Sequence, residues 1–263
     1  MPKITIAKTA GFCFGVDRAV KIVYDELEKH KVATYGPIIH NPNVVEDLTK
    51  KGVRIVNFLD ELHSDEFVII RSHGVPESVY DEINRLSLNY IDATCPFVER
   101  IHKIVKEKSD SGYTILIAGD KIHPEVEGIV GHCSEKAFIF ADDFEIENFF
   151  KKNNELFKKK VAIVAQTTYN IRIWDKCVKI ARQYCKEAEI YNTICDATTK
   201  RQAEAIGLAK QSDAMVIIGG KHSSNTVKLF TVCSELCKCY LIENADELRG
   251  IDFSNTDSIG ITA

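Results

Sequence analysis

Three cysteines share a local setting that suits metal ligands. Cys13, Cys95 and Cys195 each lie in a short turn between an apolar, strand-like run and a helix-like run, as if one unit were used three times. A helix N-terminus presents N–H groups and about half a positive charge, so it lowers the pKa of a thiol and stabilises an anionic ligand. Three thiolates that converge from three such turns would hold a metal centre.

The ligand type narrows the choice of metal. Three thiolates select zinc or an iron–sulfur cluster, but a structural zinc site usually needs a fourth Cys or His and close C-x2-C pairs, which are absent around these three cysteines. A cubane cluster held by three cysteines instead leaves one iron without a protein ligand. That iron can bind substrate as a Lewis acid and, in a reduced cluster, supplies electrons.

The other six of the nine cysteines lack this setting. Cys233, Cys237 and Cys239 form a C-x3-C-x-C run, with the first two spaced i,i+4 on a helix-like segment. The run could be a second metal site, but small buried thiols on a core-facing stripe explain it more simply, since unpaired Cys is among the most buried residue types. Structural disulfides are not expected in a reducing compartment.

A second group of polar residues follows the strand-like runs. Because ligands bind outside the carboxyl ends of the strands in open α/β sheets, these side chains are expected to face a common space. Histidines, hydroxyls and amides are good hydrogen-bond partners for phosphate oxygens. The group comprises His40, His73, His123 with Glu125, Thr167 with Thr168, and Ser223 with Ser224 and Asn225.

Each member also has a simpler explanation. A single His after a strand is more often a loop or capping residue, the Ser223–Asn225 triplet could be a helix N-cap, and Glu125 could be a solvated carboxylate. Their joint occurrence at strand ends favours a binding pocket. The P-loop and G-x-G-x-x-G patterns are absent, so the sequence does not support nucleotide binding by those devices.

The elements that must position these residues alternate along the chain. Short β-branched runs are separated by amphipathic stretches with helical period, which is typical of parallel sheets with crossover helices. We predict an α/β fold of three similar units, with mostly parallel sheets. The units are residues 14–95, 96–192 and 193–263, with an N-terminal strand in 1–13 joined to the third.

Composition excludes several classes of protein. The 263 residues are 45% apolar, enough for a sizeable core, and carry a net charge of −4. Lys and Arg are scattered, so no basic stripe indicates nucleic-acid binding. No apolar run is long enough for a membrane span, and no signal-peptide pattern opens the sequence, so we predict a cytoplasmic protein without membrane association.

Seven motifs together resemble one enzyme family. GFCFGVDRAV, IIHN, RSHGV, DATCP, HPEVEG, QTT and KHSSNT occur in the order and at the intervals seen in the 4-hydroxy-3-methylbut-2-enyl diphosphate reductase family, and the resemblance runs from residue 3 to the final ITA. It implies three α/β units arranged as a trefoil about a central cavity. A [4Fe–4S] cluster would bind Cys13, Cys95 and Cys195, leaving one iron open.

The resemblance also implies roles for the strand-end residues. His40, His73, His123, Thr167, Ser223, Ser224 and Asn225 would bind the diphosphate or hydroxyl of the substrate, and Glu125 would deliver protons. The reaction would be reductive dehydroxylation of 4-hydroxy-3-methylbut-2-enyl diphosphate to isopentenyl and dimethylallyl diphosphate. A ferredoxin or flavodoxin type of protein would supply the electrons.

One departure and two alternatives accompany this prediction. In the family the Thr-Ala pair is followed by Gly, a small residue and a diphosphate-binding Ser or Thr, whereas this sequence stops at Ala263, so one phosphate contact is expected to be missing or trimmed. A hydro-lyase would use the open iron without net redox chemistry. A non-enzymatic iron–sulfur sensor would need a partner or nucleic-acid surface and would have no use for a phosphate pocket.

Overall fold

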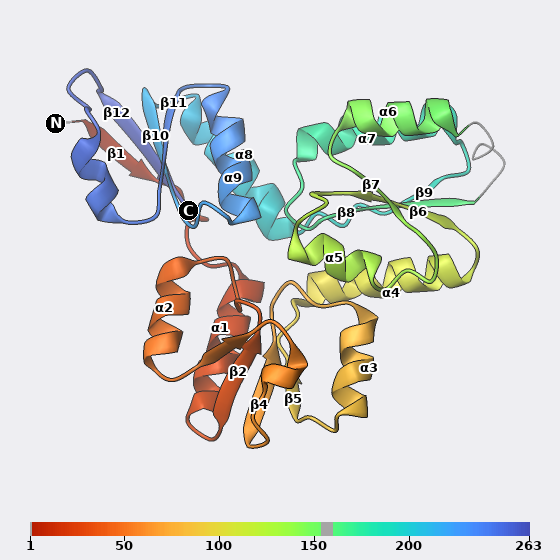
Figure 1. The fold of residues 1–263 in the computed structure, drawn as a ribbon. Coiled ribbons are helices and arrows are strands. Elements are labelled where there is room, and N and C mark those ends of the chain that lie inside the picture. The colour runs from red at the N-terminus through yellow and green to blue at the C-terminus, as the bar shows by residue number, and fades with distance from the viewer. Residues whose placement is uncertain (1, 154–159) are drawn as a thin grey trace. The chain divides into compact units, whose positions relative to one another are not determined.

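The computed structural model describes residues 2–153 and 160–263. Within them, twelve strands form three four-stranded sheets, and every strand pair is parallel (Figure 1). Helices connect successive strands, as a parallel sheet requires. The predicted α/β class with three parallel-sheet units is confirmed. The trefoil arrangement about a cavity stays a prediction.

The chain divides into two compact units. The smaller comprises Met1–Phe14, His40–Glu46 and Cys195–Ala263, and the larger comprises Gly15–Ile39 and Asp47–Ile194. The larger unit therefore contains the first two sheets and the smaller contains the third. The boundaries predicted at 95/96 and 192/193 stay predictions.

The first sheet has the strand order β3-β2-β4-β5. Leu59, Val68, Ile70, Val75 and Ile83 form a core cluster on one of its faces. The elements are α1 (Phe14–Leu27), β2 (Lys31–Tyr35), α2 (Pro42–Lys50), β3 (Arg54–Val56), the short 3-10 helix η1 (Leu59–Glu61), β4 (Glu66–Ile70), α3 (Glu77–Arg85) and β5 (Tyr90–Asp92).

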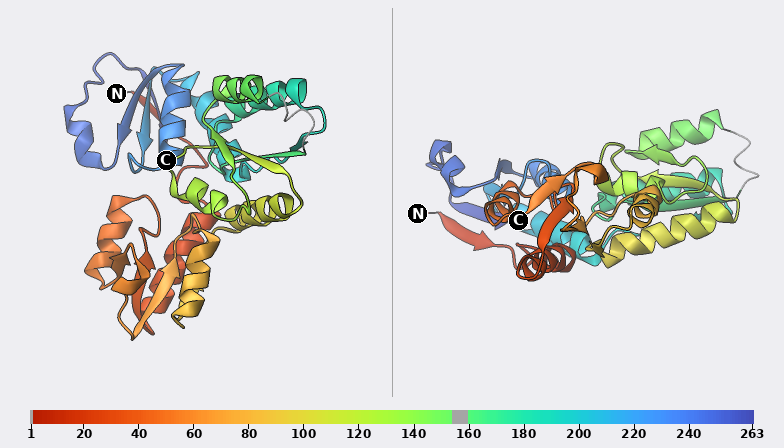
Figure 2. Two further views of the ribbon diagram at one scale, coloured as in Figure 1. Left: turned by 45° about the vertical axis from the view of Figure 1, so that its right-hand side comes forward. Right: turned by 60° about the horizontal axis from the view of Figure 1, so that its bottom comes forward.

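The second sheet has the order β7-β6-β8-β9, with α6 and α7 along one face and α4 and α5 along the other, which Figure 2 shows from two more directions. All five residues of β8 are buried because both faces are covered. The elements are α4 (Pro96–Asp110), β6 (Thr114–Ala118), α5 (Pro124–Val130), β7 (Phe138–Phe140), α6 (Asp143–Lys152), β8 (Val161–Ala165), α7 (Ile171–Tyr184) and β9 (Glu189–Ile190).

Alternating residues of β6 supply the two cores of this sheet. Leu116 and Ala118 join the aromatic cluster beneath α6 and α7, whereas Ile115 and Ile117 join the aliphatic cluster beneath α4 and α5. The alternation follows from the two-residue period of a strand. These cores fix the strand ends from which the candidate site residues extend.

The third sheet has the order β1-β12-β10-β11, so the N-terminal strand pairs with the last strand of the chain. Helices α8 and α9 pack on one face through Ala205, Met215, Ile217 and Leu229. The elements are β1 (Lys3–Ile6), α8 (Asp196–Ala209), β10 (Ala214–Ile218), α9 (Ser224–Ser234), β11 (Lys238–Ile242), the 3-10 helix η3 (Ala245–Gly250) and β12 (Ser258–Thr262).

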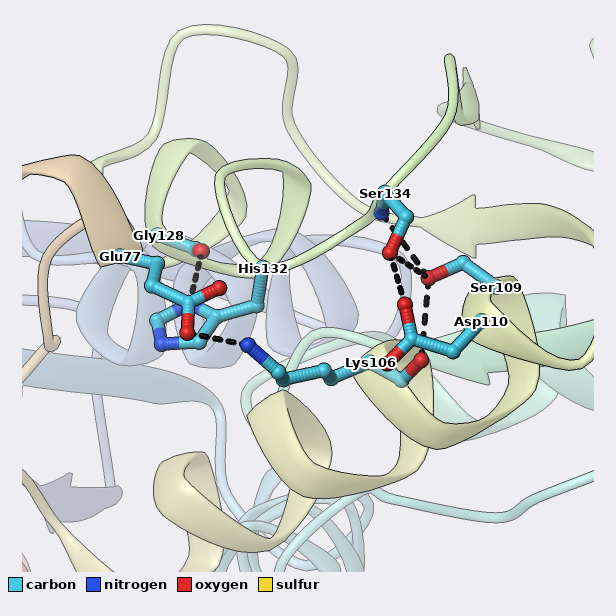
Figure 3. Close-up of polar contacts among 7 residues, drawn as sticks. All are labelled: Glu77, Lys106, Ser109, Asp110, Gly128, His132 and Ser134. Atoms are coloured by element: carbon cyan, nitrogen blue, oxygen red, sulfur yellow. Dashed lines mark hydrogen bonds and ion pairs between the residues drawn. The ribbon is translucent and has the colours of Figure 1, made fainter.

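Polar contacts and a histidine stack join α3, α4 and α5 inside the larger unit. Glu77 at the start of α3 forms an ion pair with Lys106 of α4, as Figure 3 shows. The rings of His102 and His132 stack with centroids 3.9 Å apart, and His132 Nδ1 lies 2.8 Å from the Gly128 carbonyl. Burial lowers the pKa of His102 to about 3, so the His102 ring is neutral near pH 7. The junction fixes the first sheet against the second.

The structure corrects one local prediction and adds one finding. Helix α9 ends at Ser234, so Cys237 lies beyond the helix and does not share its face with Cys233. The cause is the turn at 235–237, which leads directly into β11. Among the described residues, no helix combines the length and apolar character needed to cross a membrane.

Candidate functional site

Each of the three predicted cluster cysteines immediately precedes a helix. Cys13 precedes α1, whereas Cys95 and Cys195 are the N-cap residues of α4 and α8. All three side chains are half-buried. Because the first N–H groups of a helix have no partner inside the helix, each thiolate lies where an anion is stabilised.

Neighbouring residues shape the space around two of these thiols. A Cβ built on Gly15 would lie 2.5 Å from Cys95 Sγ, so only glycine leaves room for the sulfur there. The Cys195 sulfur accepts a hydrogen bond from the Thr198 backbone N–H at 3.4 Å and lies 3.1 Å from the Thr198 hydroxyl. The Cys195 sulfur is therefore held in place by Thr198, and the Cys95 sulfur occupies a space that the absence of a side chain at Gly15 leaves open.

The chain on the two sides of Cys13 makes different contacts. Before it, the Lys8 and Thr9 backbone N–H groups donate to Glu204 of α8 at 2.7 and 2.9 Å, inside the smaller unit. After it, Arg18 of α1 donates to the Thr94 carbonyl at 3.1 Å, inside the larger unit. The segments on both sides of Cys13 are therefore held by hydrogen bonds within their own units.

The remaining cysteines have a different environment. Among the described residues, which include all nine cysteines, no disulfide is formed. Cys177, Cys185 and Cys233 are buried in the core clusters, and burial raises the pKa of Cys177 to about 12. A thiol that stays protonated is a poor metal ligand, so Cys177 is not expected to bind metal. The burial of Cys233 in a core cluster agrees with the buried-thiol explanation given for the C-x3-C-x-C run.

Glu125 and Thr167 form a buried pair. The Glu125 carboxylate accepts hydrogen bonds from the Thr167 backbone N–H at 2.6 Å and from its hydroxyl at 2.8 Å. Glu125 is only 2% exposed, and this burial raises its pKa from 4.5 to about 7, although the two hydrogen bonds oppose the shift. A carboxyl group with this pKa can both hold and release a proton near neutral pH.

His123 lies beside this pair as the N-cap of α5. Its Nδ1 accepts a hydrogen bond from the Glu125 backbone N–H at 3.1 Å. A neutral His123 therefore carries its proton on Nε2, which can donate to a phosphate oxygen. Pro124 at the first helical position fixes the entry into the helix, because its φ is pre-set and it lacks an N–H.

His73 completes the group within the larger unit. Its ring lies edge-on to that of His123, with centroids 5.4 Å apart. Gly74 has a φ of +73°, and a Cβ built on it would lie 2.5 Å from His102, so the turn that carries His73 requires glycine. The ends of β4, β6 and β8 thus bring His73, His123, Glu125 and Thr167 together.

The predicted polar residues of the smaller unit lie around α9. Ser223 is the N-cap of α9 and accepts a hydrogen bond from the Thr226 backbone N–H at 3.4 Å, while Ser224 and Asn225 open the helix. A Cβ built on Gly220 would lie 2.4 Å from the His40 backbone oxygen, so the His40 segment packs against this turn. The N-cap explanation for Ser223 is correct and remains compatible with ligand binding.

Two residues at the site carry signals that sequence analysis did not use. Gly15 follows Cys13 by two residues in GFCFGV, and a glycine early in a helix signals a close approach. Thr198 follows Cys195 by three residues, the spacing at which a helix N–H meets its capping side chain. Their partners, Cys95 and Cys195, became visible only in the folded chain.

The comparisons with known proteins cover nearly the whole chain. The family model described as LytB protein matches residues 4–263. A protein of Caldanaerobacter subterraneus subsp. tengcongensis named 4-hydroxy-3-methylbut-2-enyl diphosphate reductase is 45% identical, over 99% of this chain and 91% of its own. One of the same name from Clostridioides difficile is 44% identical, over 99% and 92%.

A solved structure agrees with these matches. The E-1-hydroxy-2-methyl-but-2-enyl-4-diphosphate reductase from Plasmodium falciparum aligns with a TM-score of 0.91 and 26% identity, covering 99% of this chain and 82% of that one. The matched residues include every cysteine and every strand-end residue of the site. The chain therefore belongs to the LytB protein family, the family of the 4-hydroxy-3-methylbut-2-enyl diphosphate reductases.

Proposed function

We propose that this enzyme reduces 4-hydroxy-3-methylbut-2-enyl diphosphate to isopentenyl diphosphate and dimethylallyl diphosphate. The observation that carries the proposal is the setting of Cys13, Cys95 and Cys195, each of which directly precedes or caps a helix N-terminus. The family membership supports the same reaction.

These residues fit a [4Fe–4S] cluster with three protein ligands. The donor set is three half-buried thiols, and Gly15 leaves beside Cys95 Sγ a space that any Cβ would fill. Cys13, Cys95 and Cys195 would hold the cluster. When bound, such a cluster supplies electrons and an open iron that acts as a Lewis acid toward a hydroxyl group.

The polar residues at the strand ends would bind the diphosphate. His123 would donate through Nε2, because its Nδ1 already accepts the Glu125 N–H. His40, His73, Ser223, Ser224 and Asn225 offer further donors to phosphate oxygens. Thr167, whose N–H and hydroxyl both donate to Glu125, would serve the site through that carboxyl group. Donors that are already in position around the diphosphate need little rearrangement during the reaction. Exclusion of water would strengthen each of their hydrogen bonds.

Glu125 would supply protons. The reaction consumes two electrons and two protons per substrate and releases the hydroxyl group as water, so a proton donor is needed beside the reacting carbon and oxygen. A pKa of about 7 keeps a large share of Glu125 protonated near neutral pH. Thr167 orients the Glu125 carboxyl group through two hydrogen bonds. The carbon of the substrate's allyl group that receives the proton would decide between isopentenyl and dimethylallyl diphosphate.

The test is anaerobic turnover with a defined electron donor. The purified protein, with its iron content measured, is given the substrate and a reduced ferredoxin or flavodoxin, and both products are quantified. We expect product only with the reduced donor. Consumption of substrate without any donor would instead indicate a hydro-lyase, and binding of substrate without turnover by the cluster-loaded protein would contradict the proposed reaction.

A further inference from the structure

His102 of α4 lies where three segments of the candidate site meet inside the larger unit. Helix α4 is capped by Cys95, the turn after β4 carries His73, and helix α5 is capped by His123. His102 is only 5% exposed, and the proposed reaction gives it no task. It can therefore affect the site residues without touching the substrate.

Two glycines bring the turn and α5 against the His102 ring. A Cβ built on Gly74 would lie 2.5 Å from the ring carbon Cε1 and 3.2 Å from Nε2, and one built on Gly128 would lie 3.3 Å from Nε2. The Cβ position of Gly128 is also 3.5 Å from the Gly74 carbonyl carbon, so α5 packs directly on the backbone of the turn. His102 thus fills the junction between the turn and α5.

Hydrogen bonds fix the shape of the turn and attach it to α4. The Gly74 N–H donates to the Arg71 carbonyl at 3.0 Å, and the Cys95 N–H donates to the Ser72 carbonyl at 3.0 Å. Toward α5, Arg71 forms an ion pair of 3.4 Å with Glu127, whose side chain is 64% exposed. An exposed pair of this kind contributes little. The spacing between the turn and α5 therefore depends mainly on the packing at their junction.

The His102 ring acts in this junction through its shape rather than through a charge. Burial lowers its pKa to about 3, so it is neutral near pH 7. Its Nε2 is buried and meets no hydrogen-bond partner among the described residues. The ring stacks on that of His132, with centroids 3.9 Å apart, which limits its movement. An uncharged, rigid ring is therefore held against Gly74.

We propose that His102 is a positioning residue, which holds the turn at Gly74 so that the His73 ring stays beside that of His123. The inference rests on the proposed function, in which both histidines bind the diphosphate. Their rings lie edge-on with centroids 5.4 Å apart, so a small shift of the turn changes how the two donors meet one ligand. Loss of the His102 ring would leave a cavity behind Gly74 into which the turn can relax.

The experiment is a double-mutant cycle on the anaerobic holoenzyme without an electron donor, so that the substrate binds without turnover. Calorimetry measures substrate affinity, and absorbance verifies the cluster. His102→Ala should weaken binding roughly tenfold, because it displaces a donor to a charged group. In the His73→Ala background the same change should alter affinity less than about twofold, because the donor through which His102 acts is gone. An equal loss in both backgrounds, or no loss with His73 present, overturns the proposal.

Ile101→Ala is the matched control, because it truncates a neighbouring buried side chain of α4 but opens its cavity in the core of the second sheet. It should lower stability and leave substrate affinity unchanged. Hydrogen exchange of the peptide 71–76 should become faster in His102→Ala and not in Ile101→Ala. Equal weakening of binding in the two variants would indicate general destabilisation and overturn the proposal.

Failure of the proposed function gives a different result. Unchanged affinity of the single variant His73→Ala would remove His73 from the diphosphate site and contradict the proposed function at this residue. Weaker binding by His73→Ala together with normal binding by His102→Ala refutes the positioning role alone. If His102→Ala does not fold, His102→Asn is a smaller truncation that can be carried through the same cycle.

Discussion

The second and third α/β units have equivalent strands and helices but carry different polar residues at equivalent positions. Strands β6 and β10 begin at Thr114 and Ala214, and helices α5 and α9 begin at Pro124 and Ser224, so equivalent positions are numbered 100 apart. In this register Cys95 matches Cys195. The capping residue His123, however, matches Ser223, and Glu125 matches Asn225.

The difference separates what a repeat keeps from what it changes. His123 and Ser223 perform the same backbone task, since each accepts a hydrogen bond from an N–H in the first turn of its helix. The second helical position carries a titratable carboxyl in one unit and an amide in the other. The proposed cluster would use the same ligand, a cysteine, from each unit. The proposed substrate has two unlike ends, so it would need different side chains at equivalent positions of the units.

The largest expected effect tests the equivalence of the cysteines. Cys95→Ser and Cys195→Ser, together with Cys13→Ser, should each abolish the visible absorbance and lower the iron content of the anaerobically purified protein, since each thiolate would hold a different iron. Serine at Cys233, Cys237 or Cys239 should leave both unchanged. Cluster loss in the second group with retention in the first would refute the assignment.

Replacement of Glu125 and of Asn225, the second residues of α5 and α9, tests whether the two units have different roles. Glu125→Gln keeps the shape of the side chain but cannot relay a proton, so turnover should fall roughly 10²–10⁴-fold while cluster and substrate binding persist. Asn225→Ala is the matched change in the third unit and should weaken binding without this loss in turnover. Near-normal turnover of Glu125→Gln with an intact cluster would place the proton donor elsewhere.

Glu125 should also make the free energy of unfolding depend on pH. Burial raises the pKa of Glu125 from 4.5 to about 7, so its contribution to stability is fully present below pH 4.5 and is lost as the pH rises through 7. The Glu125→Gln variant lacks this loss. Its free energy of unfolding should therefore rise relative to that of the wild-type protein by up to roughly 3 kcal/mol as the pH increases through this range. Denaturant unfolding at several pH values measures the gap.

Asn225 provides the control for this titration, because an amide does not ionise. The Asn225→Ala variant should keep the same stability difference from the wild-type protein from pH 5 to pH 8. A constant gap between Glu125→Gln and wild type over the same range would mean that Glu125 titrates in the folded protein as it does in water.

The smallest expected effect compares the two capping residues. His123→Ala and Ser223→Ala should each weaken substrate binding by about 1–3 kcal/mol, the usual cost of losing a hydrogen bond to a charged group. We expect the larger loss at His123, because it lies beside Glu125 and His73. Anaerobic calorimetry measures both affinities, and an equal, unchanged affinity in the two variants would exclude them from the diphosphate site.

Much of the fold and part of the site could be predicted because they rest on local signals. Alternating β-branched and amphipathic segments specify parallel strands with crossover helices, since burial on both faces of a strand such as β8 demands a continuous apolar run. The turns around Cys95 and Cys195 could be placed at helix starts, because an apolar strand-like run precedes each cysteine and a helix-like run follows it. The extent of α9 beyond Cys233 could not, because the turn into β11 overrides the helical pattern.

The sequence by itself determined the residue types, their order and the helix N-termini on which the cysteines lie, because capping and hydrophobic period act over a few residues. Only the tertiary structure decided that Glu125 is buried against Thr167 and that Gly15 makes room for the Cys95 sulfur. These contacts join segments 42 and 80 residues apart. Their energies depend on burial and distance, which no local pattern encodes.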